Sequence, residues 1–157
     1  MDSGHMEIHR AVPEDALALT RIAFEAKRHW GYPEKWIESW SGSLTIHADF
    51  IASQETWKAV GELGIAGFYA LAARSGELEL EHLWVLPGAM GQGIGRELFV
   101  HAMECARRLA FGSVQIESDS NAEGFYLHMG ARRVGRIAKP VGGEMRELPM
   151  LRFELGI

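Results

Sequence analysis

At residues 91–96 the chain reads Gly91-Gln92-Gly93-Ile94-Gly95-Arg96, a glycine-rich run between a strand-like segment (78–85) and an amphipathic helical pattern. Glycine lets the backbone N–H groups of such a turn approach a ligand without obstruction by a Cβ atom. The positive end of the helix dipole favours an anion at the same point, most simply a phosphate. The run therefore predicts a pyrophosphate-binding turn, and the next question is which cofactor it holds.

Two common phosphate-binding motifs fit this turn poorly. The dinucleotide fingerprint G-x-G-x-x-G needs a third glycine where the chain has Arg96. Glu117 does lie at the end of the next predicted strand, where a ribose-binding acid would be expected, but only one βαβ unit is visible and a meander precedes it. A Walker loop requires Gly-Lys-Ser/Thr after the glycines, which this run lacks. A nucleotide oxidoreductase is thus disfavoured, and binding of NAD(P)H would reveal one.

The order of predicted elements indicates an α+β fold with a mixed sheet. Strands are expected at 7–11, 56–61, 64–73, 78–85, 113–118, 132–136 and 148–153, and helices at 13–28, 33–40, 45–53, 94–109 and 122–129. Asn121 is the expected N-cap of the last helix. With no internal repeat and no linker, residues 1–157 are predicted to form one domain. Residues 1–5 could be a tag remnant or a disordered leader, with Met6 the natural start.

Composition excludes several classes of protein. The 157 residues are 47% hydrophobic and 24% charged, and a net charge of -5 argues against nucleic-acid binding. No apolar run approaches the about 18 residues that span a bilayer, so no membrane association and a cytoplasmic location are expected. The single cysteine, Cys105, excludes a disulfide framework and reads as a buried structural thiol. The histidines are scattered without paired ligand spacing, so no metal is expected.

The chain resembles the GNAT family of N-acetyltransferases from Ile8 to Phe153. Three segments carry the resemblance: residues 80–87, the turn from Met90 to Arg96, and Asn121-Ala122-Glu123-Gly124-Phe125-Tyr126. The family motif Q/R-x-x-G-x-G/A reads Met90-Gly91-Gln92-Gly93-Ile94-Gly95 here, so Met90 replaces the usual polar first residue and leaves the backbone cradle intact. The resemblance implies a GNAT fold: a mixed central sheet whose two middle strands splay apart, flanked by helices on both faces.

The resemblance also implies acetyl-CoA as cosubstrate. The diphosphate would be held by Met90, Gly91, Gln92, Gly93, Ile94, Gly95 and Arg96. In relatives the strand corresponding to Leu83, Trp84 and Val85 bulges and splays from the next strand. Pantetheine then pairs with it as an extra strand, and the N–H of Val85 would polarise the thioester carbonyl. Asn121 would hydrogen-bond the pantetheine arm, and Phe125 would pack against it.

Acetyl transfer to an amine also needs a proton acceptor for the amine and a proton donor for the leaving thiolate. Tyr126 matches the family's general acid. Glu81 is the candidate base, because carboxylates on this strand serve that purpose in several relatives, usually through water; a chain of bulk water could serve instead. Strict strand alternation puts Glu79 on the same face as Glu81 and His82 on the opposite face.

The acceptor site is expected near an aromatic segment that follows the first helix. Trp30 and Tyr32 lie in a break between helices, where aromatic side chains often line a pocket. Trp36 and Trp40 are four apart, which is more typical of helix packing. Together with Glu79 and Glu117, the aromatic rings would suit a cationic amine through cation–π contact.

The leading interpretation is an acetyl-CoA-dependent N-acetyltransferase that acts on a primary amine of a small molecule, by direct attack in a ternary complex. A peptide or protein N-terminus or lysine as acceptor stays open, as does a non-catalytic acyl-CoA sensor that keeps the turn but not the chemistry. The family often dimerises through sheet edges or terminal strands, and nothing in residues 148–153 decides for or against a homodimer.

Overall fold

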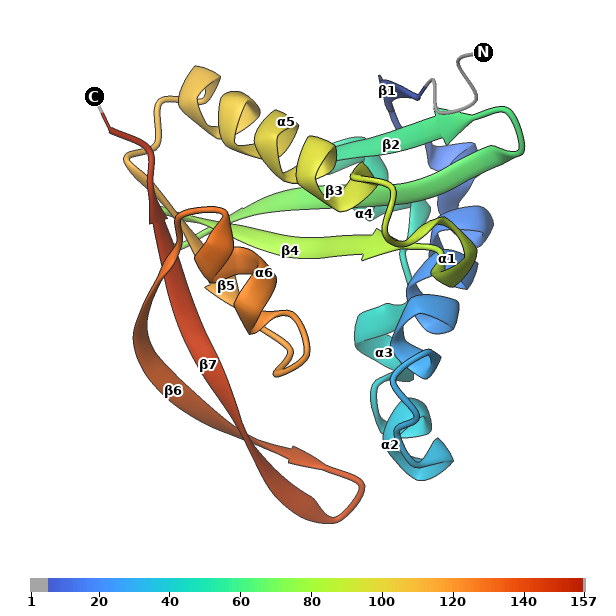
Figure 1. Cartoon of the computed structure of the whole chain (residues 1–157), viewed down its shortest axis with the longest axis vertical. Helices are drawn as coiled ribbons and strands as arrows, with labels where there is room; N and C mark the ends of the chain where they lie inside the picture. Colours follow the sequence, from blue (N-terminus) through green and yellow to red (C-terminus); the bar gives the residue numbers. More distant parts are fainter. Residues whose placement is uncertain (1–5, 157) are drawn as a thin grey trace.

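The computed structural model describes residues 6–156, which form a seven-stranded mixed sheet in the order β1-β2-β3-β4-β5-β7-β6 (Figure 1). The strands are β1 (Glu7–Arg10), β2 (Glu55–Gly61), β3 (Gly64–Arg74), β4 (Glu77–Val85), β5 (Ser113–Glu117), β6 (Arg132–Val141) and β7 (Glu144–Glu154). Neighbours pair antiparallel except β4 and β5, which are parallel. The predicted α+β class with a mixed sheet is confirmed. Residues 1–5, predicted to be a tag remnant or leader, lie outside the described residues.

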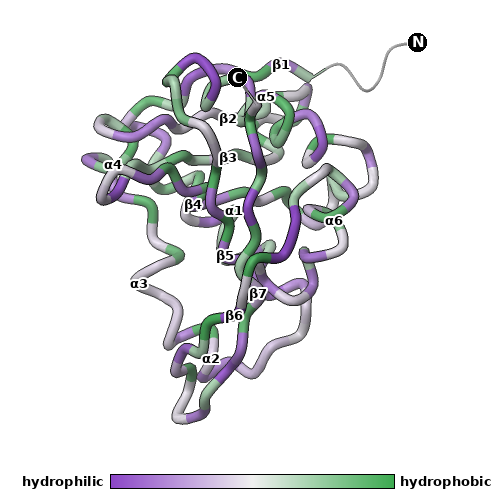
Figure 2. The backbone as a smooth tube through the Cα atoms, turned by 90° about the vertical axis from the view of Figure 1, so that its left-hand side faces the viewer, coloured by the Kyte–Doolittle hydropathy of each residue, from purple (hydrophilic) through white to green (hydrophobic). Residues whose placement is uncertain are grey.

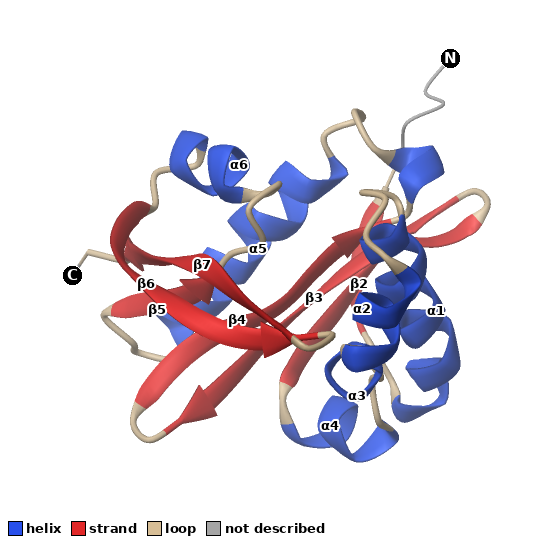
Figure 3. Ribbon diagram, turned by 90° about the horizontal axis from the view of Figure 1, so that it is seen from below, coloured by secondary structure: helices blue, strands red, loops and turns tan. Residues whose placement is uncertain are grey.

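Helices cover both faces of the sheet (Figure 3). On one face lie α5 (Ile94–Arg108) and α6 (Glu123–His128); on the other lie η1 (Pro13–Asp15), α1 (Ala16–Arg28), α2 (Glu34–Ser39), α3 (Ser41–Leu44) and α4 (Ala48–Ser53). Each face has its own apolar core, with Leu98 and Phe99 of α5 in one and Leu19 and Ile22 of α1 in the other. Both helices bury residues at helical spacing, which is why each presents one apolar stripe to the sheet. None of the helices described in residues 6–156 is long and apolar enough to cross a bilayer.

The two middle strands, β4 and β5, part from each other. In the described chain their ladder has one paired position, Glu79 opposite Gln115, and the strands diverge beyond it (Figure 1). β4 stays paired with β3 up to Val85, and the next N–H, that of Leu86, donates to the Ala66 carbonyl at 2.8 Å. In an antiparallel ladder this makes Val85 a non-hydrogen-bonded position, so its N–H points away from β3 toward the open edge. The predicted splay is confirmed.

The bulge in β4 lies earlier than predicted. Ala70 pairs with His82 and Leu71 with Leu80, so Glu81 is the extra residue, two positions before the expected Leu83–Val85 segment. An extra residue reverses the alternation of faces that follows it. His82 therefore lies on the same face as Glu79, and the prediction that it lies on the opposite face from both glutamates is wrong. The bulge is what gathers these three side chains.

The last two strands are also longer than the predicted 132–136 and 148–153. They form a hairpin joined by Gly142 and Gly143, whose φ values of 53° and 84° suit a two-residue turn. The expected glycine-rich loop is thus a tight turn. The alternation of apolar and polar residues did not reveal the strand pairing on either side of it. The hairpin tip lies beside α2, far from α5 (Figure 2), and the Trp36 indole N–H donates to Glu144 at 3.4 Å.

Two helix predictions need correction. The helix expected at 45–53 begins at Ala48, as α4, and the backbone is extended at Thr45 and His47; α3, which precedes it, lies outside the predicted helices. The N-cap of α6 is Ala122 rather than Asn121, and no side-chain hydrogen bond caps this helix. The Asn121 amide binds other partners, as described below.

We expect Gly67→Ala to destabilise the fold by about 1–3 kcal/mol, because overpacking at a fixed backbone forces the neighbours apart. A Cβ atom at Gly67 would lie 2.7 Å from the Trp84 carbonyl oxygen and 3.3 Å from the Val85 Cα. Urea unfolding gives the free energy. Gly135→Ala, also in a strand but with nothing within 4 Å of its Cβ position, is the control and should unfold like the parent protein. Equal stability of the two variants would contradict the prediction.

Candidate active site

A cavity of about 490 Å³ opens at the edge where β4 and β5 part. We call it the turn cavity, because the glycine-rich turn forms one end of it. It contains eleven of the twelve residues predicted to bind the cofactor, and Tyr126: Leu83, Trp84, Val85, Met90, Gly91, Gly93, Ile94, Gly95, Arg96, Asn121 and Phe125. Gln92 is the exception, since it is exposed and does not line the cavity. The structure thus brings together segments that lie apart in the sequence, from Leu83 to Tyr126.

The turn presents unpaired N–H groups to this cavity. Gly91 and Gly93 have φ values of 81° and 83°, a left-handed conformation that side chains rarely adopt. Gly93 is the N-cap of α5, and the N–H of Glu97 donates to its carbonyl at 3.0 Å. The N–H groups of the first helical turn before Glu97 therefore have no partner within the helix. Together with the Arg96 side chain they suit an anion such as a diphosphate.

Tyr126 lies in the wall of the turn cavity and is 7% exposed. Its ring packs at 5.9 Å from Phe99 and at 5.3 Å from Phe125. Burial, and then the charge of Asp119, raise the pKa of the Tyr126 phenol above its ordinary value. The phenol is therefore protonated at neutral pH.

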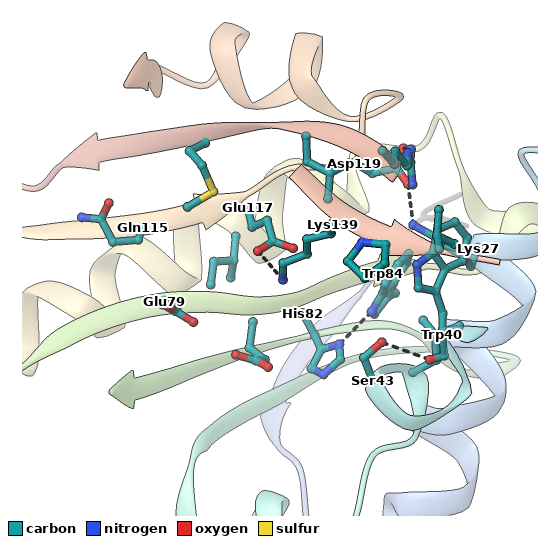
Figure 4. Close-up of a pocket in the computed structure, with 18 of the residues that line it drawn as sticks. Lys27, Trp40, Ser43, Glu79, His82, Trp84, Gln115, Glu117, Asp119 and Lys139 are labelled. Carbon is teal, nitrogen blue, oxygen red and sulfur yellow. Dashed lines mark hydrogen bonds and ion pairs between the residues drawn. The ribbon is translucent and has the colours of Figure 1, made fainter. Parts of the chain in front are cut away.

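A second cavity, also of about 490 Å³, lies on the other side of the gap (Figure 4). We call it the hairpin cavity, because the β6–β7 hairpin forms its outer wall with Lys139, Pro140 and Val141. The two cavities share five lining residues: Leu80, Glu81, Trp84, Glu117 and Asp119. They therefore meet where β4 and β5 part.

The three glutamates that line the hairpin cavity each lie near an exposed cation. Glu81 lies 2.9 Å and Glu79 3.7 Å from the Arg74 guanidinium, and Glu117 lies 2.7 Å from the Lys139 ammonium. The Arg74 and Lys139 side chains are about half exposed, and pairs of this kind contribute at most about 1 kcal/mol. A cationic ligand could displace either partner at small cost. Glu81 and Glu117 face both cavities, whereas Glu79 faces the hairpin cavity alone.

His82 is not a base at this site. Burial, and then the charge of Arg74, lower the pKa of His82 to about 4, so the ring is neutral at pH 7. The Trp84 indole, which can only donate, gives its N–H to His82 Nδ1 at 3.0 Å. The ring proton therefore lies on Nε2, and the lone pair that could accept a proton is already engaged. Glu81 and Glu117 are the glutamates that border both cavities, together with Asp119.

A buried ion pair that the sequence analysis missed lies beside the junction of the cavities. Lys27 Nζ of α1 lies 2.5 Å from Asp119 Oδ2, and their side chains are 10% and 14% exposed. Burial opposes the Asp119 charge, but the Lys27 ammonium and hydrogen bonds from Lys27, Asn121 and Tyr32 hold the pKa of Asp119 below its usual range. Burial lowers the pKa of Lys27, against the attraction of Asp119. The signal in the sequence for this buried lysine was its position, because Lys27 adjoins the buried apolar stripe of α1.

The aromatic side chains already contact cations of the chain itself. Lys27 Nζ lies 4.1 Å from the centre of the Trp40 ring, and the Arg146 guanidinium lies 4.8 Å from that of Tyr32. A ligand cation at Tyr32 or Trp40 would compete with these contacts. Trp30, 46% exposed, lines the turn cavity rather than the hairpin cavity, and Tyr32 lines neither.

Cys105 is remote from both cavities. It is 3% exposed in the core under α5, and its thiol donates to Glu55 Oε1 at 3.3 Å. Burial, and then Glu55, raise the pKa of the thiol to about 11, which suits the predicted structural role. In the part of the chain that the structure describes, no three His, Cys, Asp or Glu side chains gather as a metal-binding group.

Comparisons with known proteins agree on one family. A family profile described as an acetyltransferase (GNAT) domain matches residues 33–146. Streptothricin acetyltransferase of Streptomyces lavendulae is 38% identical over 88 residues, which cover 54% of this chain and 45% of that protein. The chain therefore matches less than half the length of this curated relative.

Solved structures agree on the fold. A GCN5-related N-acetyltransferase from Rhodopseudomonas palustris superposes with a TM-score of 0.77 at 20% identity, over 94% of each chain. The PaiA N-acetyltransferase from Thermoplasma acidophilum, solved with coenzyme A, gives 0.76 at 19% identity, over 96% of this chain and 99% of that one. At such identities the similarity concerns the fold alone.

We expect Asp119→Asn to lower the free energy of unfolding at pH 7 by about 3 kcal/mol, because it leaves the Lys27 ammonium buried without a counter-ion. The pKa of Asp119 is lower in the folded state than in the unfolded one. Its contribution is therefore complete above the unfolded value, about pH 4, and is lost as the pH falls through the folded value. The difference between parent and variant should shrink at about pH 3.

Denaturant titrations at both pH values measure this difference. Adding Lys27→Met to the Asp119→Asn variant removes the stranded charge and should recover much of the stability at pH 7. A pH-independent difference, or no recovery in the double variant, would contradict the assignment.

Proposed function

The chain belongs to the GNAT family of acetyltransferases, and on that premise we propose that it transfers the acetyl group of acetyl-CoA to a primary amine of a small molecule, by direct attack in a ternary complex. The observation that carries the proposal is the junction of the two cavities at the gap between β4 and β5. A donor in one cavity and an acceptor in the other would meet there without a covalent enzyme intermediate.

The turn cavity suits acetyl-CoA, the activated acyl donor. The unpaired N–H groups at the start of α5 and Arg96 would hold its diphosphate. The open edge of β4 would pair with the amides of the pantetheine arm, and the outward N–H of Val85 would polarise the thioester carbonyl. Asn121 and Phe125 would contact the same arm. The coenzyme A complex of the PaiA enzyme, which shares the fold, supports this placement.

The protons of the reaction have candidate donors and acceptors at the junction. The acceptor amine would lose its proton to Glu81, directly or through water, and its nitrogen would form a bond to the acetyl carbon. As the carbon–sulfur bond breaks, Tyr126 would protonate the departing sulfur. Its raised pKa keeps the phenol protonated until then. Glu117, which also borders both cavities, is the alternative proton acceptor.

The hairpin cavity suits a small amine. Its volume of about 490 Å³ falls within the range of small-molecule sites. Glu79, Glu81 and Glu117 would attract an ammonium group in place of Arg74 or Lys139. The similarity to streptothricin acetyltransferase favours an amine-bearing small molecule of that kind over a protein acceptor.

A thermal-shift titration with acetyl-CoA, followed by a panel of amines assayed for released thiol, tests the proposal. We expect acetyl-CoA to raise Tm, since a ligand that binds the folded state stabilises it. Turnover of polyamines, amino sugars or amino-acid amines would support a small-molecule acceptor. Turnover of peptides alone would contradict that choice, and binding without any turnover would indicate an acyl-CoA sensor.

We expect Tyr126→Phe to lower kcat by about 10²-fold, the usual size of a general-acid contribution, while the Kd for CoA stays unchanged. The phenyl ring keeps its packing against Phe99 and Phe125, so only the proton donor is lost. Steady-state kinetics and calorimetry measure the two quantities. A parental kcat would remove Tyr126 from the mechanism.

Glu81→Gln should lower kcat/KM at least about tenfold at neutral pH and less at high pH, where the amine is already deprotonated. Glu79→Gln, which alters a carboxylate that faces the hairpin cavity alone, is the matched comparison and should leave the pH dependence of kcat/KM unaltered. The same loss in Glu117→Gln, with none in Glu81→Gln, would transfer the role of base to Glu117.

A further inference from the structure

The Tyr32 hydroxyl lines neither cavity, yet it contacts groups beside both of them. It donates to Asp119 Oδ1 at 2.8 Å, and accepts from Asn121 Nδ2 at 2.8 Å and from Arg146 Nη2 at 2.6 Å. A phenol has one proton to donate and two lone pairs, so all of its hydrogen-bonding capacity is used. Burial, and then Asp119, raise the pKa of Tyr32 to about 12, and the hydroxyl therefore keeps its proton.

These contacts fix the orientation of the Asn121 amide. The Asp119 carboxylate can only accept, and the Tyr32 hydroxyl gives its one proton to that carboxylate. The group of Asn121 that faces them must therefore be the NH₂. Its Nδ2 donates to Tyr32 at 2.8 Å and to Asp119 at 3.0 Å, and the Asn121 backbone N–H donates to Asp119 at 2.8 Å. Both amide protons are used, so Oδ1 is the polar atom of this side chain left for a ligand.

Asn121 itself lines the turn cavity. The network that holds it joins the loop after α1, the loop after β5 and strand β7, which are far apart in the sequence. Lys27 of α1 also contacts the Asp119 carboxylate, as its ion-pair partner. The loop that contains Tyr32, which was expected to contact the acceptor, therefore holds Asn121 in the turn cavity, where the donor would bind.

We propose that Tyr32 is a positioning residue for the acyl donor. Through its hydroxyl it holds Asn121 with Oδ1 ready to accept an N–H of an amide-bearing arm in the turn cavity. The proposal rests on the proposed function, since pantetheine supplies that arm. It reverses the expectation that Tyr32 contacts the acceptor: the residue acts on the donor, and through Asn121.

Tyr32→Phe tests the proposal, because it keeps the ring contacts with Trp36 and Trp40 and removes the hydroxyl. We expect the Kd for CoA, measured by calorimetry, to rise about tenfold, the scale of a disrupted buried hydrogen-bond network. The Kd for adenosine 3′,5′-bisphosphate, which lacks the arm, should stay unchanged. A general loss of structure would weaken both ligands alike.

Two further variants separate positioning from packing. Tyr69→Phe removes another buried phenol, bonded to His101 at 2.7 Å on the other face of the sheet, and should leave both Kd values unchanged. Asn121→Ala should weaken CoA binding about as much as Tyr32→Phe does, and the double variant should bind no more weakly than either single variant.

Three results would overturn the inference: unaltered CoA binding in Tyr32→Phe, equal weakening of both ligands, or full additivity with Asn121→Ala. In each case CoA binding by the parent protein would still uphold the proposed function. Failure of the parent protein to bind CoA would overturn both.

Discussion

The structure depends on the parting of two parallel strands, β4 and β5. Their ladder pairs Glu79 with Gln115, and beyond that position no strand within residues 6–156 lies beside the outward N–H and C=O groups of β4. Such groups cost free energy if they are buried without partners, so they must meet solvent or a ligand. The open edge therefore offers hydrogen-bonding groups to solvent or to a ligand, and the two cavities meet there.

The gap must be held open and at a defined width. Side chains from both sides of it join through the Lys27–Asp119 ion pair and the Tyr32 hydroxyl, which link α1 and its following loop to the loop after β5. A buried ion pair contributes little net stability compared with apolar packing, but breaking it strands a charge. This asymmetry makes the pair a suitable device for fixing the position of Asp119 and of the neighbouring Asn121.

Sequence patterns recovered the elements whose signal is local. The turn at 91–96, the α5 stripe and the α+β order follow from glycine chemistry and from periods of 3.6 and 2. The bulge at Glu81 was placed two residues too late, because one extra residue leaves no mark in composition. The lengths of β6 and β7 were underestimated for a related reason: both strands are largely exposed there and lack the apolar alternation that marks a buried face.

By itself the sequence determined the glycine-rich turn at 91–96, since such a turn is built from consecutive residues whose backbone preferences are local. The network beside the junction of the two cavities was decided by the tertiary structure. Lys27, Tyr32, Asp119 and Arg146 are separated by up to 119 residues, and none has a local pattern that announces a site. Their charges and the Tyr32 hydroxyl form one network because they are buried in contact with each other. That burial depends on how the sheet and its helices pack.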